Sequence, residues 1–143
     1  MELKNKKINF LGDSITEGVG ASEEQYIYLN VVAGECGLAA ARNYGISGTR
    51  IARQDDEELF GNPFCDRYLT MDDDADVIVV FGGTNDYGHG RAPFGTFDDR
   101  TGDTYYGAWH VLLRGLLEKY PDGQIVVMTP LHRTEENVPS PGN

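Results

Sequence analysis

One apolar run constrains the fold more than any other feature of the sequence: Val77-Ile78-Val79-Val80-Phe81, in a segment that begins at Ala75. Its apolar residues are continuous instead of alternating with polar ones, which is typical of a strand covered on both faces in a parallel sheet. We expect further strands at 7–11, 39–46 and 124–129, the last of them also buried. The chain therefore has enough strand-forming segments for a single α/β sheet.

The segments between these strands predict helices and loops. A strong amphipathic helix is expected where apolar residues recur at i, i+3, i+4, i+7 and i+8: Trp109, Leu112, Leu113, Leu116 and Leu117. Another helix is expected over 26–37, where Gly37 is well placed to end it. The 52–69 stretch predicts helix and loop with a break at Asn62-Pro63, and 87–104 predicts a long loop. Strands alternating with helices indicate an α/β domain with a mainly parallel sheet.

Composition excludes several classes of partner. The 143 residues suit one domain, and 40% hydrophobic with 24% charged residues is ordinary for a globular chain. The net charge of −11 repels phosphate backbones and anionic membrane surfaces, so neither nucleic acid nor membrane is an expected partner. No apolar run approaches the ~20 residues that span a bilayer. The N-terminal apolar segment ends at Gly12, too early for a signal peptide, so a cytoplasmic location is the default expectation.

No metal or other cofactor is expected. Cys36 and Cys65 are far apart and form no C-x-x-C pair, and the sequence has no cluster of His and Cys. The acidic residues at 72–76 resemble the start of a calcium-binding loop, but Val77 and Gly83 stand where that loop requires Gly and Glu. A solvated acidic segment ahead of a strand explains them better.

Three polar clusters each follow an expected strand: Gly12-Asp13-Ser14, Ser47-Gly48 and Gly83-Thr84-Asn85-Asp86. Ligands of open parallel sheets bind at the carboxyl ends of the strands, so these clusters predict one shared site. A serine in a tight strand-to-helix turn exposes its hydroxyl as a nucleophile. A glycine leaves a backbone N–H unobstructed, and an asparagine side chain adds a neutral donor for an oxyanion.

The three clusters together resemble the sequence blocks of the SGNH hydrolases, also called the GDSL family of esterases and lipases. Gly12-Asp13-Ser14 matches the first block, Gly48 the second and Gly83-Thr84-Asn85-Asp86 the third. The resemblance implies a flavodoxin-like three-layer α/β/α domain and a serine ester hydrolase. It also implies that Ser14 attacks the ester carbonyl, while the N–H groups of Ser14 and Gly48 and the Asn85 side chain hold the oxyanion. Asp13 is then expected to order the turn.

The family's fourth block, a C-terminal Asp-x-x-His that supplies the general base and its orienting carboxylate, does not occur after the last expected strand. The one Asp-x-x-His of the sequence, Asp86-Tyr87-Gly88-His89, overlaps the third block. Of the three histidines, His110 is expected to be structural and His89 to lie in a surface loop. His132 follows the last expected strand and is a weak candidate for a substitute base. We expect the base, together with a last strand and helix, to lie outside these residues, so that 1–143 is one domain incomplete at its C-terminus. The alternative is that the chain is inactive.

Candidate substrate contacts are Asp13, Arg50, Tyr87 and Phe94. Arg50 is expected at the rim of the site, and the 87–104 loop is expected to form a wall or lid over it, which suits a small or carbohydrate-linked acyl ester. An equally weighted reading is that Phe94 and Phe97 only pin this loop to the domain. A non-catalytic ligand-binding domain of the same fold is the alternative function. A nucleotide-binding flavodoxin-like domain is disfavoured, because Ser and Asn stand where phosphate-binding glycines would be needed.

Overall fold

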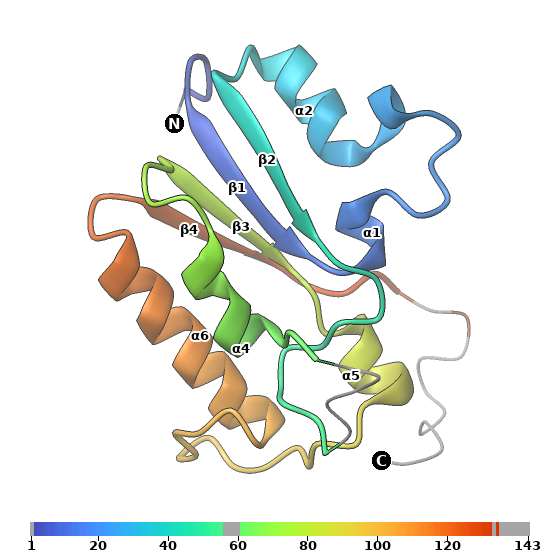
Figure 1. Cartoon of the computed structure of the whole chain (residues 1–143), viewed down its shortest axis with the longest axis vertical. Helices are drawn as coiled ribbons and strands as arrows, with labels where there is room; N and C mark the ends of the chain where they lie inside the picture. The colour runs from blue at the N-terminus through green and yellow to red at the C-terminus, as the bar shows by residue number, and fades with distance from the viewer. Residues whose placement is uncertain (1, 56–60, 133, 135–143) are drawn as a thin grey trace.

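The computed structural model describes residues 2–55, 61–132 and 134. Its centre is a four-stranded sheet in the order β2-β1-β3-β4 (Figure 1). The strands are β1 (Lys7–Gly12), β2 (Ala40–Gly45), β3 (Val77–Phe81) and β4 (Gln124–Met128). All three pairings are parallel, which confirms the expected sheet.

Helices connect the strands and cover both faces of the sheet. They are α1 (Ser14–Glu17), α2 (Tyr28–Cys36), α4 (Phe64–Arg67), α5 (Thr84–His89) and α6 (Tyr105–Lys119), with short 3₁₀ segments at Glu24–Tyr26 and Tyr68–Thr70. Figure 1 shows α1 and α2 on one side of the sheet, with α4 and α6 on the other. As expected, α2 ends at Gly37, which adopts a left-handed conformation with φ of 61°.

The core explains why the run in β3 is continuous. All five of its residues are buried, because β1 and β4 flank the strand and helices cover both faces. Val77 and Val79 pack with Leu29 of α2 on one face. On the other face, Ile78 and Val80 belong to a cluster that includes, from the helices, Phe64, Cys65, Ala108, Leu112 and Leu116. The structure is thus the three-layer α/β/α arrangement that the sequence predicts.

Two expected elements differ from the structure. The 124–129 strand is not buried: Val127 is 46% and Met128 37% exposed, because among the described residues β4 pairs with β3 alone and lies at the edge of the sheet. The 87–104 loop begins later than expected, because α5 continues to His89. The last turn of α5 is closed by the Gly90 N–H, which donates to the Asp86 carbonyl at 3.0 Å.

The 52–69 stretch is described in part. Its break at Asn62-Pro63 is confirmed, since α4 begins directly after Pro63. Residues 56–60 of this stretch, and the expected loop at the end of the chain, lie outside the described residues.

The two faces of α6 offer a matched test of the core. Leu112 is fully buried in the cluster beneath the sheet, whereas Leu117 on the same helix is exposed. Leu112→Ala is expected to lower the free energy of unfolding by about 2–5 kcal/mol, because it removes buried methyl groups and leaves a cavity. Leu117→Ala is expected to change it by about 0.5 kcal/mol or less. Urea denaturation measures both, and equal losses would contradict this packing.

Asp76 is expected to make the free energy of unfolding depend on pH. Its carboxylate accepts hydrogen bonds from the Lys7 N–H at 2.8 Å and the Lys6 Nζ at 3.0 Å, and these bonds hold its pKa below the usual range. Stability from a lowered carboxyl pKa is present above the ordinary pKa and is lost as pH falls through the folded-state value. Asp76→Asn is therefore expected to be less stable than wild type at neutral pH, with the gap closing in acid. Asp122→Asn is the control, and thermal unfolding across pH is the measurement.

Candidate active site

The parallel register brings the three polar clusters to one edge of the sheet. Gly12, at the end of β1, is paired with Gly45 of β2 and with Phe81 of β3. Each cluster begins at or just after these residues, at the carboxyl ends of three adjacent strands. The Ile46 N–H also donates to the Gly12 carbonyl at 3.1 Å, which carries the pairing of β1 with β2 beyond the strand end. The shared position that the sequence predicts is therefore the one the fold creates.

Ser14 is the first residue of α1 and is half-buried. Asp13 caps this helix, because its Oδ1 accepts a hydrogen bond from the Ile15 N–H at 3.0 Å. The Asp13 side chain is only 1% exposed, and burial raises its pKa. Asp13 thus caps α1 and orders the turn, and its contact with a substrate stays a prediction.

The loop around Gly48 is held from both sides. The Glu17 carboxylate of α1 accepts hydrogen bonds from the Ser47 N–H, at 2.7 Å, and from the Ser47 hydroxyl. On the other side, Arg50 Nη1 donates to the Gly48 carbonyl at 2.8 Å. Gly48 itself is exposed and has φ of 75°, a left-handed conformation that favours glycine. The first and second clusters are therefore tied together through Glu17, a role that no sequence motif indicated.

Arg50 does not lie at the rim of the site. Its side chain is 2% exposed, and its Nη2 donates to the carbonyl of His89 at 3.1 Å while Nη1 bonds Gly48. Burial lowers its pKa, and the nearby Asp86 opposes that shift. Arg50 therefore connects the Gly48 loop to the end of α5 and is buried instead of lying at the expected rim.

The third cluster is bonded to the second. Gly83 precedes α5 with φ of 104°, again a conformation that favours glycine. From the first turn of α5, Asn85 Nδ2 donates to the Thr49 carbonyl at 3.0 Å. The Asp86 carboxylate accepts from the Ile51 N–H at 2.9 Å and from the Ala52 N–H at 3.2 Å. Both side chains thus satisfy backbone groups of the segment that follows Gly48.

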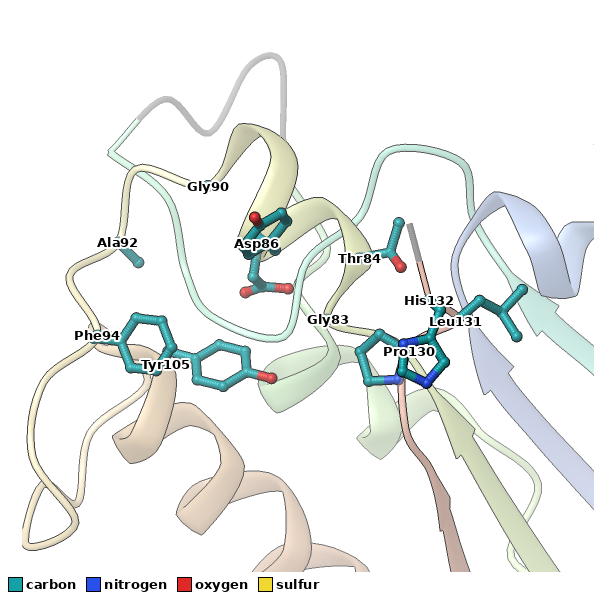
Figure 2. A pocket seen from close by; sticks show the side chains of 11 residues that line it. Gly83, Thr84, Asp86, Gly90, Ala92, Phe94, Tyr105, Pro130, Leu131 and His132 are labelled. Carbon is teal, nitrogen blue, oxygen red and sulfur yellow. The ribbon is translucent and has the colours of Figure 1, made fainter. Parts of the chain in front are cut away.

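A pocket of about 320 Å³ lies beside the third cluster (Figure 2). It is lined by Gly83, Thr84, Asp86, Tyr87, Gly90, Ala92, Phe94, Tyr105, Pro130, Leu131 and His132. In Figure 2 the Phe94 and Tyr105 rings stand together on one side, and the segment 130–132 lies near Thr84 on the other. The structure thus brings Tyr87 and Phe94, two of the expected substrate contacts, into one pocket.

The aromatic residues of the loop differ in their surroundings. Phe94 packs against Tyr105 with ring centroids 5.2 Å apart and also lines the pocket. Phe97 packs against Tyr106 and against His110 of α6, at 6.4 and 5.5 Å, and is not among the lining residues. Phe97 therefore contacts α6 outside the pocket and stays 73% exposed, whereas Phe94 contacts Tyr105 and also lines the pocket.

Other candidate reactive groups lie outside the three clusters. His110 is half-buried in α6, and His89 ends α5, whereas His132 lines the pocket. Cys36 and Cys65 are free thiols, and burial raises the pKa of Cys65 to about 12, which disfavours the reactive thiolate. Within 2–55, 61–132 and 134, no group of three or more His, Cys, Asp or Glu side chains is placed to hold a metal ion.

Comparison with known sequences identifies the family. The profile of the GDSL-like Lipase/Acylhydrolase family matches residues 10–143, and the chain therefore belongs to this family. A comparison with curated proteins finds no match. No helix of the described residues is both long and apolar enough to cross a bilayer.

Solved structures share the fold. A protein from Lactobacillus plantarum is 32% identical with a TM-score of 0.78, over 94% of this chain and 61% of that protein. A candidate GDSL-like lipase from Bacteroides uniformis is 24% identical with a TM-score of 0.78, over 92% of this chain and 74% of that protein. A carbohydrate acetylesterase family member from Sinorhizobium meliloti is 22% identical with a TM-score of 0.58, over 92% of this chain and 67% of that protein. The chain spans 61% and 65% of the length of two solved relatives that are 32% and 30% identical to it.

The buried Asp86 carboxylate gives a test of how the third cluster is anchored. Asp86→Asn replaces an oxygen that accepts from a backbone N–H with a competing donor, and it removes the charge that strengthens these bonds. We expect the free energy of unfolding to fall by about 2 kcal/mol. Asp98→Asn, in the exposed loop, is the control, and denaturant titration is the measurement. An unchanged Asp86→Asn protein would show that the carboxylate does not hold this segment.

Proposed function

We propose that this chain carries the nucleophile and the oxyanion hole of a serine ester hydrolase. The observation that carries the proposal is the hydrogen bond from Asn85 Nδ2 to the Thr49 carbonyl, because it joins the third cluster to the residue that follows Gly48. An amide nitrogen carries two hydrogens. Thr49 takes one of them and thereby orients the amide, which leaves the other for an oxyanion.

In the proposed reaction, the Ser14 hydroxyl oxygen attacks the carbonyl carbon of the ester. A C–O bond forms, and the carbonyl oxygen becomes an oxyanion that accepts from the N–H groups of Ser14 and Gly48 and from Asn85 Nδ2. The intermediate collapses to an acyl-enzyme and releases the alcohol, and water then hydrolyses the acyl-enzyme. A general base takes the Ser14 proton and gives it to the departing alcohol oxygen.

We infer that this base and its orienting carboxylate come from outside the 143 residues. The one Asp-x-x-His of the sequence, Asp86 to His89, belongs to the third cluster, where the Asp86 carboxylate accepts from the Ile51 and Ala52 N–H groups, and none follows β4. An unassisted serine hydroxyl is a weak nucleophile at neutral pH. Residues 1–143 would then be one incomplete domain that holds the electrophile-binding half of the site.

The pocket supports a small or carbohydrate-linked acyl ester as substrate. Its aromatic lining includes Tyr87, Phe94 and Tyr105, and its polar groups are few, as is usual for small-molecule sites. Aromatic faces suit the apolar face of a sugar ring or a short acyl group. A solved structure of the same fold is named as a carbohydrate acetylesterase family member, which agrees with this class. Tyr87 and Phe94 are the proposed substrate contacts.

A non-catalytic ligand-binding domain is the second candidate. It is favoured by the pocket itself, which is formed by described residues without any contribution from a fourth block. Ligand binding without hydrolysis at any pH, in the full-length polypeptide, would support this candidate and exclude the esterase.

Hydrolysis of p-nitrophenyl acetate by the full-length polypeptide tests the esterase. Ser14→Ala is expected to lower kcat by about 10³-fold or more, because it removes the attacking oxygen. Asn85→Ala is expected to lower kcat by about 10²–10³-fold, the usual effect of losing one oxyanion donor. Ser22→Ala, an exposed serine away from the strand ends, is the control and should match wild type. Full activity in Ser14→Ala would sink the proposed mechanism.

A further inference from the structure

Arg67 occupies an unusual place at the carboxyl edge of the sheet. It is the last residue of α4, and its side chain is only 8% exposed. Its Nη2 donates to the Gly12 carbonyl at 2.5 Å and to Thr49 Oγ1 at 2.9 Å. Its Nη1 donates to the Tyr44 carbonyl at 2.5 Å. One guanidinium therefore contacts the ends of β1 and β2 and the loop that carries Gly48.

These partners are the residues on which the proposed oxyanion hole is built. Gly12 directly precedes the Asp13-Ser14 turn, and Thr49 directly follows Gly48. The Thr49 hydroxyl also donates to the Ile46 carbonyl at 2.7 Å, so it accepts from Arg67 while it closes its own loop. The Thr49 carbonyl accepts from Asn85 Nδ2. Arg67 therefore bonds one residue that adjoins Gly48 and contacts Asn85, and another that lies two residues before Ser14.

The environment of Arg67 keeps it in place. Its Nε donates to the Asn62 carbonyl at 2.9 Å, and its guanidinium carbon lies 4.5 Å from the centre of the Phe64 ring. Burial lowers the pKa of Arg67 to about 10, so the group stays charged at neutral pH, and the negative charge of Asp13 opposes that shift. Burying a cation is costly unless its donors are satisfied. Here four hydrogen bonds give each of the three guanidinium nitrogens at least one acceptor.

We propose that Arg67 is a positioning residue that sets the distance between the Ser14 turn and the Gly48 loop, and through Thr49 the orientation of Asn85. This inference rests on the proposed esterase function. A guanidinium suits the task because its rigid planar fork donates in several directions at once. A lysine ammonium would preserve the charge, but it is a single point that cannot span the same three carbonyl and hydroxyl oxygens.

The test compares kcat, KM and stability in the full-length polypeptide. Arg67→Lys is the main variant, and Arg53→Lys is the matched control, since Arg53 pairs with Asp66 on the exposed side of the same segment. Thr49→Val, which removes the acceptor for Arg67, is a second variant that is informative even if Arg67→Lys does not fold. Hydrolysis of p-nitrophenyl acetate is measured well below each variant's Tm. The inhibition constant of phenylboronic acid, which forms a tetrahedral adduct with a serine hydroxyl, is measured beside it.

A positioning role predicts a specific pattern. Arg67→Lys should lower kcat by about 10–100-fold with KM nearly unchanged, because small displacements of catalytic groups cost rate. Its inhibition constant for phenylboronic acid should rise by about the same factor, because that adduct uses the oxyanion hole. Thr49→Val should show the same pattern to a smaller extent, and Arg53→Lys should match wild type. In the Asn85→Ala background, Arg67→Lys should lower kcat by a smaller factor than in wild type, because part of its effect passes through Asn85.

Other results would overturn the inference. If Arg67→Lys lowers Tm but keeps kcat, Arg67 serves stability alone. If its effect multiplies fully with that of Asn85→Ala, the orientation of Asn85 does not depend on Arg67, and that part of the inference is wrong. If Arg67→Lys does not fold, an unchanged kcat in Thr49→Val overturns it. Ser14→Ala separates failure of the proposed function from failure of the positioning role. Full activity in Ser14→Ala refutes the proposed function. Loss of activity in Ser14→Ala together with normal kcat in Arg67→Lys refutes only the positioning role.

Discussion

The parallel pairing of β1 with both β2 and β3 is the constraint on which the rest of the structure depends. It places the ends of three strands side by side, with Gly12 paired to Gly45 and to Phe81. Ser14, Gly48 and Asn85 each lie within a few positions of these ends. Helices cover the sheet on each side, and β3 in its interior is therefore apolar on both faces.

Parallel strands bring the loops together, but side chains hold the loops in place. The segments after the strands lack sheet partners, so their backbone groups need other hydrogen bonds. Buried charged groups supply them: Asp86 accepts from two backbone N–H groups, and Arg50 and Arg67 donate to carbonyls of the same loops. A buried charge is tolerated where hydrogen bonds offset the cost of removing it from water, and each such bond has a well-defined direction. That direction is what an oxyanion hole requires.

The expectations that failed share a cause. Arg50 was expected at the rim because it follows Gly48 closely, yet it is buried among backbone carbonyls. The 124–129 segment was expected to be a buried strand, yet among the described residues it lies at the sheet edge. In both cases the residue type is correct, but the neighbours that decide burial are distant in the sequence.

The sequence by itself determined the sheet, its parallel direction, the helices α2 and α6, and the positions of Ser14, Gly48 and Asn85 after three strand ends. These follow from local periodicity and turn-forming residues, which act over a few positions. Only the tertiary structure decided that Glu17, Asp86 and Arg67 connect those three positions. Arg67 contacts Gly12 across 55 positions of the chain, and its segment has no motif. Hydrogen bonds between such distant residues depend on how the chain packs, and packing is decided by the whole fold at once.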